Sequence, residues 1–514
     1  MQRVNRVQGL IVIFGLSFAG VLSAQAPPEA VPAGTRAIQP SLSGRAGQSG
    51  SVTTVQTTAP GGAQSVNILN STVQVQGAYA GSVPSAQAPG AALPLSLDEA
   101  VRRGLQYNLG PLGVQHAVRQ LQGIERTERA NLYPQISGAL TATDQQTDLA
   151  ALGFSSVHAP GLAAFPTVIG PFHYFDLRAG LTQSIVDLTR LNNYRASREN
   201  VKSAQYAQQD ARDLVVLAVT GAYLQMIASS ARIDSVRAQV TTAQAVYQQA
   251  VDRHTAGVAP RIDVTRSQVE LQTDQERLAS VENDFAKQKI QFGRLIGLPP
   301  AQDFTLSDTI PYAPLTGITQ EQAMLRAYAN RADLKAAQSA VHAAEIAHQA
   351  AREERLPTAS VSADYGVIGT DPTNSHGTFA VTGAVRFPIW QGGRIQGDLE
   401  QAQAALDQRK AEYEDLRGRI DAEVRSAFLD LTSAENQLKV AQSNRDLARD
   451  TLTQARDRFA AGVADTIEVV QAQEAVAAAE QDLIAALYAH NLAKATLARV
   501  MGQAGENIKQ FLGR

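Results

Sequence analysis

The sequence predicts an α+β membrane protein built from a duplicated unit of helix, β-hairpin and long helical hairpin. Two observations carry this prediction. The stretches RHTAGVAPRIDV at Arg253–Val264 and RFAAGVADTIEV at Arg458–Val469 repeat with an offset of 205 residues, and self-similarity at a fixed offset indicates a duplicated structural unit. In each copy, segments of period-two hydrophobic alternation precede two long helical stretches, and that alternation is typical of β-strands.

Composition excludes several classes of function. The 514 residues carry a net charge of -3, with Lys and Arg interleaved with Asp and Glu, so there is no basic patch for nucleic acid. The absence of cysteine excludes disulfides, thiolate catalysis and thiolate-bound zinc. No GxxxxGK loop for nucleotides occurs, so energy for any transport must come from a partner. We expect no cofactor and no bound metal.

The N-terminal region has two parts. Residues 1–24 combine Arg3 and Arg6 with the apolar run Leu10–Leu22, which predicts a cleaved signal peptide, because the run is too short to span a membrane. Beyond it we find no stretch near twenty apolar residues and expect no transmembrane α-helix. Residues 25–92 are rich in Gln, Ala, Ser, Thr, Gly and Pro, which predicts a flexible extension. Its centre, VNILNSTVQVQGAYAG, is a candidate short strand.

The remaining chain divides into two structural repeats, residues 93–300 and 301–502, and a tail at 503–514. Ser96 followed by Asp98 and Glu99 is typical of a helix N-terminus. This helix is expected to run to about residue 131, with a break near Gly110-Pro111, and to end before Pro134. In the second copy the helix is expected over 318–354.

Four strands are expected, at about 134–147, 174–186, 358–368 and 377–390. Each alternates apolar and polar residues, and a length of about ten residues suits a barrel that spans a bilayer. Aromatic residues cluster near the strand ends, as at membrane interfaces: Tyr133, Phe172, Tyr174, Phe175, Tyr365, Phe379, Phe387 and Trp390. The alternative is an amphipathic sheet that covers a soluble core.

Two long helices follow the strands. Residues 190–256 and 394–461 contain no proline, and about 67 residues make a helix of roughly 100 Å. Beyond the first tip, apolar residues recur every seven positions, which predicts coiled-coil packing. The tips are expected at 257–260 and 462–465, where Gly257 and Gly462 can adopt the left-handed conformation that ends a helix.

Four strands per chain cannot close a barrel, and an open sheet edge is not tolerated in lipid. Several copies related by cyclic symmetry must therefore share one barrel if the strands lie in a membrane. Two copies would supply eight strands around a lumen filled by side chains, and three would supply twelve with room for water.

At this point the chain resembles the TolC-type outer-membrane efflux family over Ser96–Gly502. The resemblance is carried by NLYPQISG and RLPTASVSA before the strands, FPIWQGGR after the fourth strand, and the tips AGVAPRIDV and AGVADTIEVV. It implies a homotrimer with a twelve-stranded barrel in outer-membrane lipid and a periplasmic α-helical coiled-coil tunnel. The tips would bind a periplasmic adaptor that links the channel to an inner-membrane pump. Such a channel conducts substrates passively, in efflux or type I secretion, and is not an enzyme.

The resemblance also implies a constriction at the periplasmic mouth. Asp263 and Glu468 match the acidic positions that ring it, and Gln471 stands where a second acidic residue is found. Three copies would concentrate negative charge and favour cations. The alternative is that both carboxylates only stabilise helix N-termini. Ala464 replaces an arginine that helps to lock the closed mouth, which leaves Arg261 as a candidate for that role.

The tips are the expected adaptor contact, because small residues allow close approach of backbones. The alternative is that these residues only form the turns. The expected contact residues are Ala256, Gly257, Val258, Ala259, Ala461, Gly462, Val463 and Ala464.

Two other classes of protein were weighed. A surface coiled-coil adhesin would explain the long helices, but it needs neither hairpin tips nor paired amphipathic strands. A metal-binding bundle enzyme is suggested by Glu345-x-x-His348, but such a site needs the motif twice and two further glutamates. We therefore interpret that motif as a polar helix face.

Overall fold

A computed structural model describes residues 50–58, 69–85, 92–151, 166–309, 313–314, 317–461, 463, 466–505 and 511–512. The chain falls into two compact units. One contains the described parts of Gln135–Thr182 and Val361–Thr382, which are mostly strand, and the other contains the helices. The predicted signal peptide lies outside the described residues.

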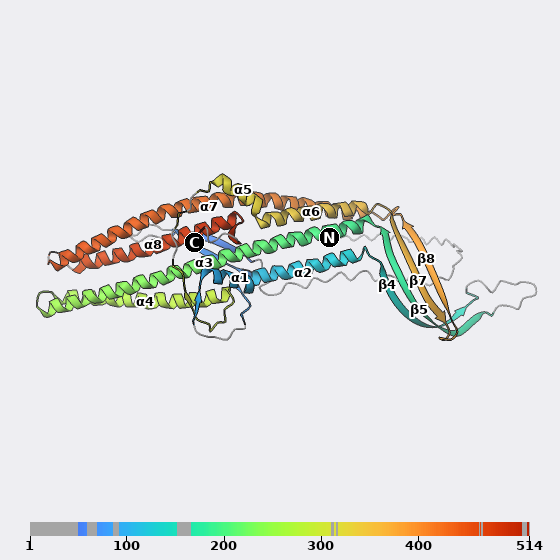
Figure 1. The fold of residues 1–514 in the computed structure, drawn as a ribbon, viewed down its shortest axis with the longest axis horizontal. Helices are drawn as coiled ribbons and strands as arrows, with labels where there is room; N and C mark the ends of the chain where they lie inside the picture. The colour runs from blue at the N-terminus through green and yellow to red at the C-terminus, as the bar shows by residue number, and fades with distance from the viewer. Residues whose placement is uncertain are drawn as a thin grey trace, which may run out of the picture. The chain divides into compact units, whose positions relative to one another are not determined.

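The helices confirm the predicted duplicated order (Figure 1). They are α1 (Leu97–Tyr107), α2 (Leu109–Ala130), α3 (Leu188–Thr255), α4 (Arg261–Leu295), α5 (Gln320–Asn330), α6 (Ala332–Glu353), α7 (Arg394–Ala460) and α8 (Thr466–Val500). The strands are β1 (Val52–Thr58), β2 (Leu69–Val75), β3 (Leu93–Leu95), β4 (Gln135–Asp148), β5 (Val168–Val186), β6 (Phe304–Leu306), β7 (Thr358–Gly369) and β8 (Ser375–Arg386), with a short 3-10 helix η2 (Gly77–Ala80).

The two repeats differ mainly in their strand hairpins. β4 begins at residue 135 and β7 at residue 358, an offset of 223, whereas α4 and α8 begin at residues 261 and 466, an offset of 205. The offset falls because nineteen residues, 149–167, join β4 to β5, and only five, 370–374, join β7 to β8. β5 is also longer than β8, with 19 residues against 12. The duplication therefore kept the lengths of the long helices almost unchanged and changed the strand hairpins.

Each long helix forms a hairpin with the helix that follows it. α3 has 68 residues and α7 has 67, and each is followed by a helix of 35 residues. α3 packs against α4, but also against α6 and α8 of the other repeat. The main core lies where these helices meet, with Val219 and Tyr223 of α3, Ile420 and Val424 of α7, and Leu497 of α8 in one buried cluster.

The middle of α3 corrects one expectation from the sequence. An eighteen-residue window of α3 has a mean hydropathy of 1.7, so by length and composition the helix could cross a membrane. We had expected no such stretch. However, 67% of the window is buried inside the chain, and a helix that is apolar on all sides is typical of a core as well as of a membrane span. The packing of α3 against α1, α2, α4, α6 and α8 accounts for its hydrophobicity.

The first helix breaks at Asn108, slightly before the predicted position at Gly110-Pro111. The Asn108 side chain is buried. Its amide donates to the carbonyl oxygens of Tyr79 at 2.7 Å and Leu295 at 3.2 Å, and its oxygen accepts from the Gly110 N–H at 2.9 Å. Pro111 lies in the first turn of α2, where a missing N–H costs nothing.

The second repeat breaks at the equivalent residue, Arg331, although the sequence predicted one continuous helix over 318–354. The Arg331 guanidinium is buried and pairs with Asp333, at 2.6 Å between Nη2 and Oδ2, and with Glu423 of α7. A buried arginine is stabilised only when carboxylates surround it. Those partners lie two and 92 residues away, so the local helix pattern gave no indication of the break.

A glycine at the end of each hairpin packs against the helix break of the same repeat. Gly297 follows α4 with φ +75°, and a side chain there would strike Tyr107. Gly502 follows α8 with φ +69°, and an added Cβ would lie 2.8 Å from the backbone nitrogen of Arg331. The left-handed conformation and the close approach both require glycine.

The N-terminal segment is partly ordered, which corrects the expectation of a flexible extension over 25–92. β1 and β2 form an antiparallel hairpin from Val52↔Val75 to Thr58↔Leu69, and β2 contacts α3 and α8. Val73 and Val75 alternate with polar residues and pack against the main core. The candidate strand within VNILNSTVQVQGAYAG is β2, and its partner β1 was not predicted. β3 pairs in parallel with β6.

The four predicted long strands form one sheet in the order β4-β5-β7-β8. β4 and β5 are antiparallel, with Gln135 opposite Thr182 and Asp148 opposite Val168, and with a bulge between Gln145 and Thr147. Because β5 neighbours β7, the sheet joins the two repeats, and β4 and β8 are its edges.

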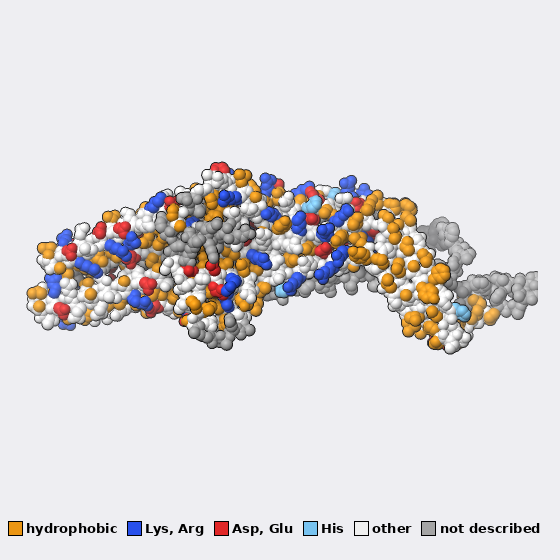
Figure 2. Space-filling view, in the orientation of Figure 1, with side chains coloured by type: hydrophobic (Ala, Val, Ile, Leu, Met, Phe, Trp, Pro, Cys, Tyr) orange, Lys and Arg blue, Asp and Glu red, His pale blue; other side chains and the backbone are white. Residues whose placement is uncertain are grey.

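One face of this sheet is apolar and exposed. Ile136 is 75% exposed, Leu140 70%, Leu177 54%, Phe379 77% and Val381 70%. Figure 2 shows hydrophobic side chains gathered over the strands, in contrast to the mixed charges on the helices. Water does not favour so large an apolar surface, and the alternation is that of a membrane barrel.

The Asn108→Ala variant tests the first helix break. The change leaves two carbonyl oxygens and one N–H without their partner in a buried site, so we expect a loss of about 3 kcal/mol of stability. Thermal unfolding, followed by the helical circular dichroism signal in detergent micelles, measures this loss. Asn193→Ala, at an exposed position of α3, is the matched control. Equal melting temperatures for the two variants would contradict the assigned role.

Candidate functional site at the hairpin tips

The first tip is a tight turn closed by backbone hydrogen bonds. Gly257 has φ +74° and donates its N–H to the His254 carbonyl at 2.9 Å, and Val258 donates to the Arg253 carbonyl at 3.0 Å. This is a helix end of the type in which a left-handed glycine satisfies the last carbonyls. The predicted turn at 257–260 is confirmed.

One backbone hydrogen bond of the first turn recurs at the second tip. Val463 donates its N–H to the Arg458 carbonyl at 3.0 Å, the counterpart of the Val258 bond. Gly462 and Ala464 lie outside the described residues. Val258 and Val463 are 67% and 68% exposed, so both tips present a branched apolar side chain to solvent. Ala256 and Ala461 are exposed beside them, and Ala259 is half-buried.

The two predicted carboxylates occupy the first turns of the following helices. Asp263 lies in the first turn of α4, after Pro260, and donates its N–H to the Pro260 carbonyl at 3.2 Å. Glu468 lies in the first turn of α8 and pairs with Arg458 of α7 at 3.5 Å. Both positions favour negative charge through the helix dipole. The geometry therefore agrees with a pore role and with the plainer role as helix stabilisers.

Gln471 lies in a groove between α4 and α8, of about 420 Å³. The groove is lined by Thr265, Arg266, Val269, Glu270, Ile467, Val470, Gln471 and Glu474. The groove places Gln471, a predicted pore residue, beside Glu270 and Glu474, two carboxylates that were not predicted.

These carboxylates form an acidic cluster with Asp274 that the sequence analysis missed. Burial raises the pKa of Glu270, and the charges of Asp274 and Glu474 raise it further. Burial also raises the pKa of Asp274, against the opposing effect of Arg277. One indication was present in the sequence: Glu270 follows Asp263 by seven residues, a spacing that places both on one face of a coiled-coil helix.

A contact between the two hairpins lies close to the tips. The guanidinium of Arg253 on α3 lies 4.5 Å from the centre of the Phe459 ring on α7, within the range of a cation–π interaction. Phe459 belongs to a buried cluster with Val469, and Val246 of α3 packs against that cluster. Arg261 was the predicted candidate for holding the mouth closed, but the observed link between hairpins is made by Arg253. Local sequence could not indicate this, because Phe459 is 206 residues away.

The suggested metal motif is part of a polar helix face. The Glu345 carboxylate faces the His342 ring at 3.3 Å and Lys410 at 4.0 Å. Among the residues that the structure describes, no group of three or more His, Cys, Asp or Glu is placed to hold a metal ion.

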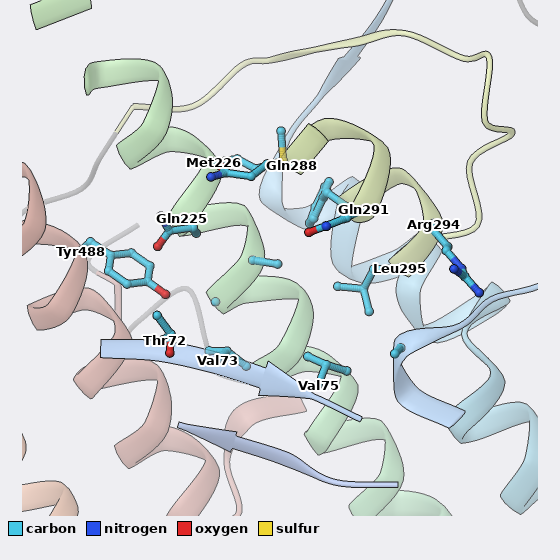
Figure 3. A pocket seen from close by; sticks show the side chains of 14 residues that line it. Thr72, Val73, Val75, Gln225, Met226, Gln288, Gln291, Arg294, Leu295 and Tyr488 are labelled. Atoms are coloured by element: carbon cyan, nitrogen blue, oxygen red, sulfur yellow. The ribbon is translucent and has the colours of Figure 1, made fainter. Parts of the chain in front are cut away.

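A hollow of about 620 Å³ in the helical unit is lined in part by Thr72, Val73 and Val75 of β2. Figure 3 shows Gln225, Gln288 and Tyr488 around it, with β2 along one side. Its lining contains no carboxylate and no histidine, and burial raises the pKa of the Tyr488 hydroxyl. The hollow therefore offers no group for acid–base chemistry near neutral pH.

A sheet with one exposed apolar face, combined with two long helical hairpins, defines an outer-membrane channel protein. The chain belongs to the outer membrane efflux protein family, whose sequence profile matches residues 113–298 and 324–503. It is 23% identical over 429 residues to the pyoverdine export outer membrane protein OpmQ of Pseudomonas aeruginosa, covering 81% of this chain and 87% of OpmQ. It is 23% identical over 322 residues to the cation efflux system protein CusC of Escherichia coli, covering 61% and 69%.

The fold agrees with solved structures. The crystal structure of the outer membrane protein VceC from Vibrio cholerae superposes with a TM-score of 0.66 at 19% identity, covering 80% of this chain and 97% of VceC. The predicted family, fold class and function are thus confirmed: the protein is an efflux channel of the outer membrane with a periplasmic helical part, and it is not an enzyme. The adhesin alternative is excluded.

The Glu474→Gln variant tests the acidic cluster. The pKa values of Glu270 and Asp274 are raised in the folded state, partly by the charge of Glu474, so these two carboxylates favour the fold at low pH and lose this contribution as pH rises through the raised pKa. Removing the Glu474 charge should therefore raise the melting temperature at pH 7.5 and change it little at pH 4.5. Differential scanning calorimetry at both pH values measures this, with Glu276→Gln, at an exposed position of α4, as the control. An equal gain at both pH values would contradict electrostatic repulsion as the cause.

Proposed function

We propose that three copies of the chain form the exit duct of a tripartite efflux system. The observation that carries this proposal is the four-stranded sheet with an exposed apolar face and two edges, β4 and β8. In lipid, edge N–H and C=O groups need partners. Pairing β8 of one copy with β4 of the next satisfies both edges by cyclic symmetry.

Three copies suit a conducting channel better than two. Eight strands enclose a lumen that side chains fill, whereas twelve leave space for water. Export is preferred to type I protein secretion because the relatives OpmQ and CusC are named for pyoverdine export and cation efflux.

The periplasmic mouth of this channel is formed by the starts of α4 and α8. Asp263, Glu468 and Gln471 face the constriction, and threefold repetition multiplies the charge of the two carboxylates. A ring of carboxylates at a narrow pore attracts cations. The positions of Asp263 and Glu468 in the first turns of α4 and α8 support this assignment, because the helix dipole favours negative charge there.

The tips bind a periplasmic adaptor. Support comes from Val258 and Val463, which are exposed by about two-thirds at equivalent positions. Exposed apolar side chains on a rigid turn are typical of a surface that a partner covers. Backbone hydrogen bonds fix the first turn, so docking there would cost little conformational entropy.

The double variant Asp263→Asn/Glu468→Gln tests the mouth. Loss of the ring should lower the permeability ratio of K⁺ to Cl⁻ by about twofold or more, because the charges stand at the narrowest point. Reversal potentials of reconstituted channels in a KCl gradient give this ratio. Asp284→Asn, on the exposed surface of α4, serves as the control. Unchanged selectivity in the double variant would reject the ring.

The double variant Val258→Asp/Val463→Asp tests adaptor docking. Two charges on the tips should abolish tip-directed crosslinking to the adaptor in cells and raise drug susceptibility to that of a deletion strain, because apolar contact is lost. Single-channel conductance should persist, since the strands are untouched. Val258→Thr/Val463→Thr, of nearly equal shape, should retain crosslinking. Full crosslinking of the aspartate variant would reject the tips as the contact.

A further inference from the structure

An ion-pair network crosses three strands of the four-stranded sheet. Arg178 of β5 donates from Nε to Asp176 of the same strand at 3.2 Å. Its Nη1 pairs with Asp364 of β7, and its Nη2 donates to the Thr378 hydroxyl of β8 at 3.1 Å. One guanidinium thus joins a carboxylate of the first repeat to a carboxylate and a hydroxyl of the second.

All four residues lie on the face opposite the apolar one. Side chains alternate between the two faces of a strand. Leu177, Tyr365 and Phe379 are 54%, 63% and 77% exposed on the apolar face, and each is the immediate neighbour of a network residue. In a barrel whose apolar face meets lipid, the network therefore faces the lumen.

The neighbouring strands leave space for the arginine on one side only. Opposite Arg178 on β4 stands Ala139, and opposite Asp176 stands Thr141; both are uncharged. On β7, Gly366 lies two residues beyond Asp364, on the same face, and an added Cβ there would be 3.0 Å from the Cβ of Arg178. The glycine leaves room for the arginine stem, and the guanidinium then reaches Asp364 and Thr378.

We propose that this Arg178 network forms a charged belt in the barrel lumen that sets the ion selectivity of the barrel, separately from the periplasmic mouth. The proposal rests on the proposed trimeric channel. The network contains two carboxylates and one guanidinium, and so carries one net negative charge per copy. Repeated around the barrel, it is a ring of alternating charge with a negative excess.

The electrostatics of the site suit this role. The side chains of Arg178 and Asp364 are each 31% exposed, and that of Asp176 is 24% exposed, so water in the lumen reaches the charges. Charges on a wall of low dielectric constant focus the field into the channel. At an ionic strength of 0.15 M the screening length is about 8 Å, so the belt acts on ions that pass close to the wall.

The experiment uses three variants in the full chain, in the Asp263→Asn/Glu468→Gln background that removes the mouth charges. Arg178→Gln raises the net charge of the belt to two negative charges per copy, and Asp364→Asn reduces it to none. The double change Arg178→Gln/Asp364→Asn keeps one net negative charge per copy. Reversal potentials of reconstituted channels in a low-salt KCl gradient give the permeability ratio of K⁺ to Cl⁻. Thr378→Val, which loses a hydrogen bond but no charge, is the control.

We expect opposite shifts, with Arg178→Gln more selective for K⁺ by about twofold and Asp364→Asn less so by a similar factor, because selectivity follows wall charge. The double variant should return to the value of the background although its ion pair is lost. If the double variant has the most altered permeability ratio, or if both single variants shift that ratio in the same direction, the network only holds the strands together. The belt is then rejected.

Failure of the wider proposal is distinguishable from failure of the belt. Wild-type chains that form no trimer and no channel would overturn both proposals. Channels of normal conductance in which none of the three variants changes the permeability ratio would overturn the belt alone. Where Arg178→Gln does not assemble, Asp364→Asn should still lower the permeability ratio, and the double variant should still leave it at the value of the background.

Discussion

The demand for paired backbone groups at the edges of an apolar sheet is the constraint on which the rest of the molecule depends. β4 and β8 end a sheet whose one face exposes Leu140 and Phe379. Such a face favours lipid, and lipid does not tolerate unpaired N–H and C=O groups. A single chain cannot place this face in lipid and also pair the backbone groups of both sheet edges. The need for further copies follows, and a shared barrel is the simplest closed solution.

The duplication supplies this sheet while it keeps the helical part rigid. Gly297 and Gly502 place the end of each hairpin against the helix break of its own repeat. The two breaks are stabilised by different interactions. The Asn108 side chain forms hydrogen bonds with backbone carbonyl groups, whereas the Arg331 guanidinium pairs with two carboxylates. Equivalent geometry with unlike polar groups indicates that the packing was preserved, whereas the residues that satisfy it were free to change.

Charge is arranged in distinct environments along the chain. Asp263 and Glu468 lie at helix starts, where the dipole stabilises ionised carboxylates. Burial raises the pKa values of Glu270, which lines the groove between α4 and α8, and of Asp274. Arg178 balances two carboxylates on the polar face of the sheet. A passive duct performs no chemistry, so the placement of these charges is the main means by which it acts on its substrates.

The sequence by itself determined the duplication, the strands, the long helices and the two tips, because each rests on local periodicity or on a turn residue such as Gly257. The motifs around the strands and at the tips also indicated the family. The sequence indicated β2 as a candidate strand, but not its pairing with β1 or the packing of Val73 and Val75 against the core. Only the tertiary structure decided which distant residues meet, as Arg253 meets Phe459 and Arg178 meets Asp364. The physical reason is that such pairs depend on the register between elements roughly 200 residues apart, which no local pattern encodes.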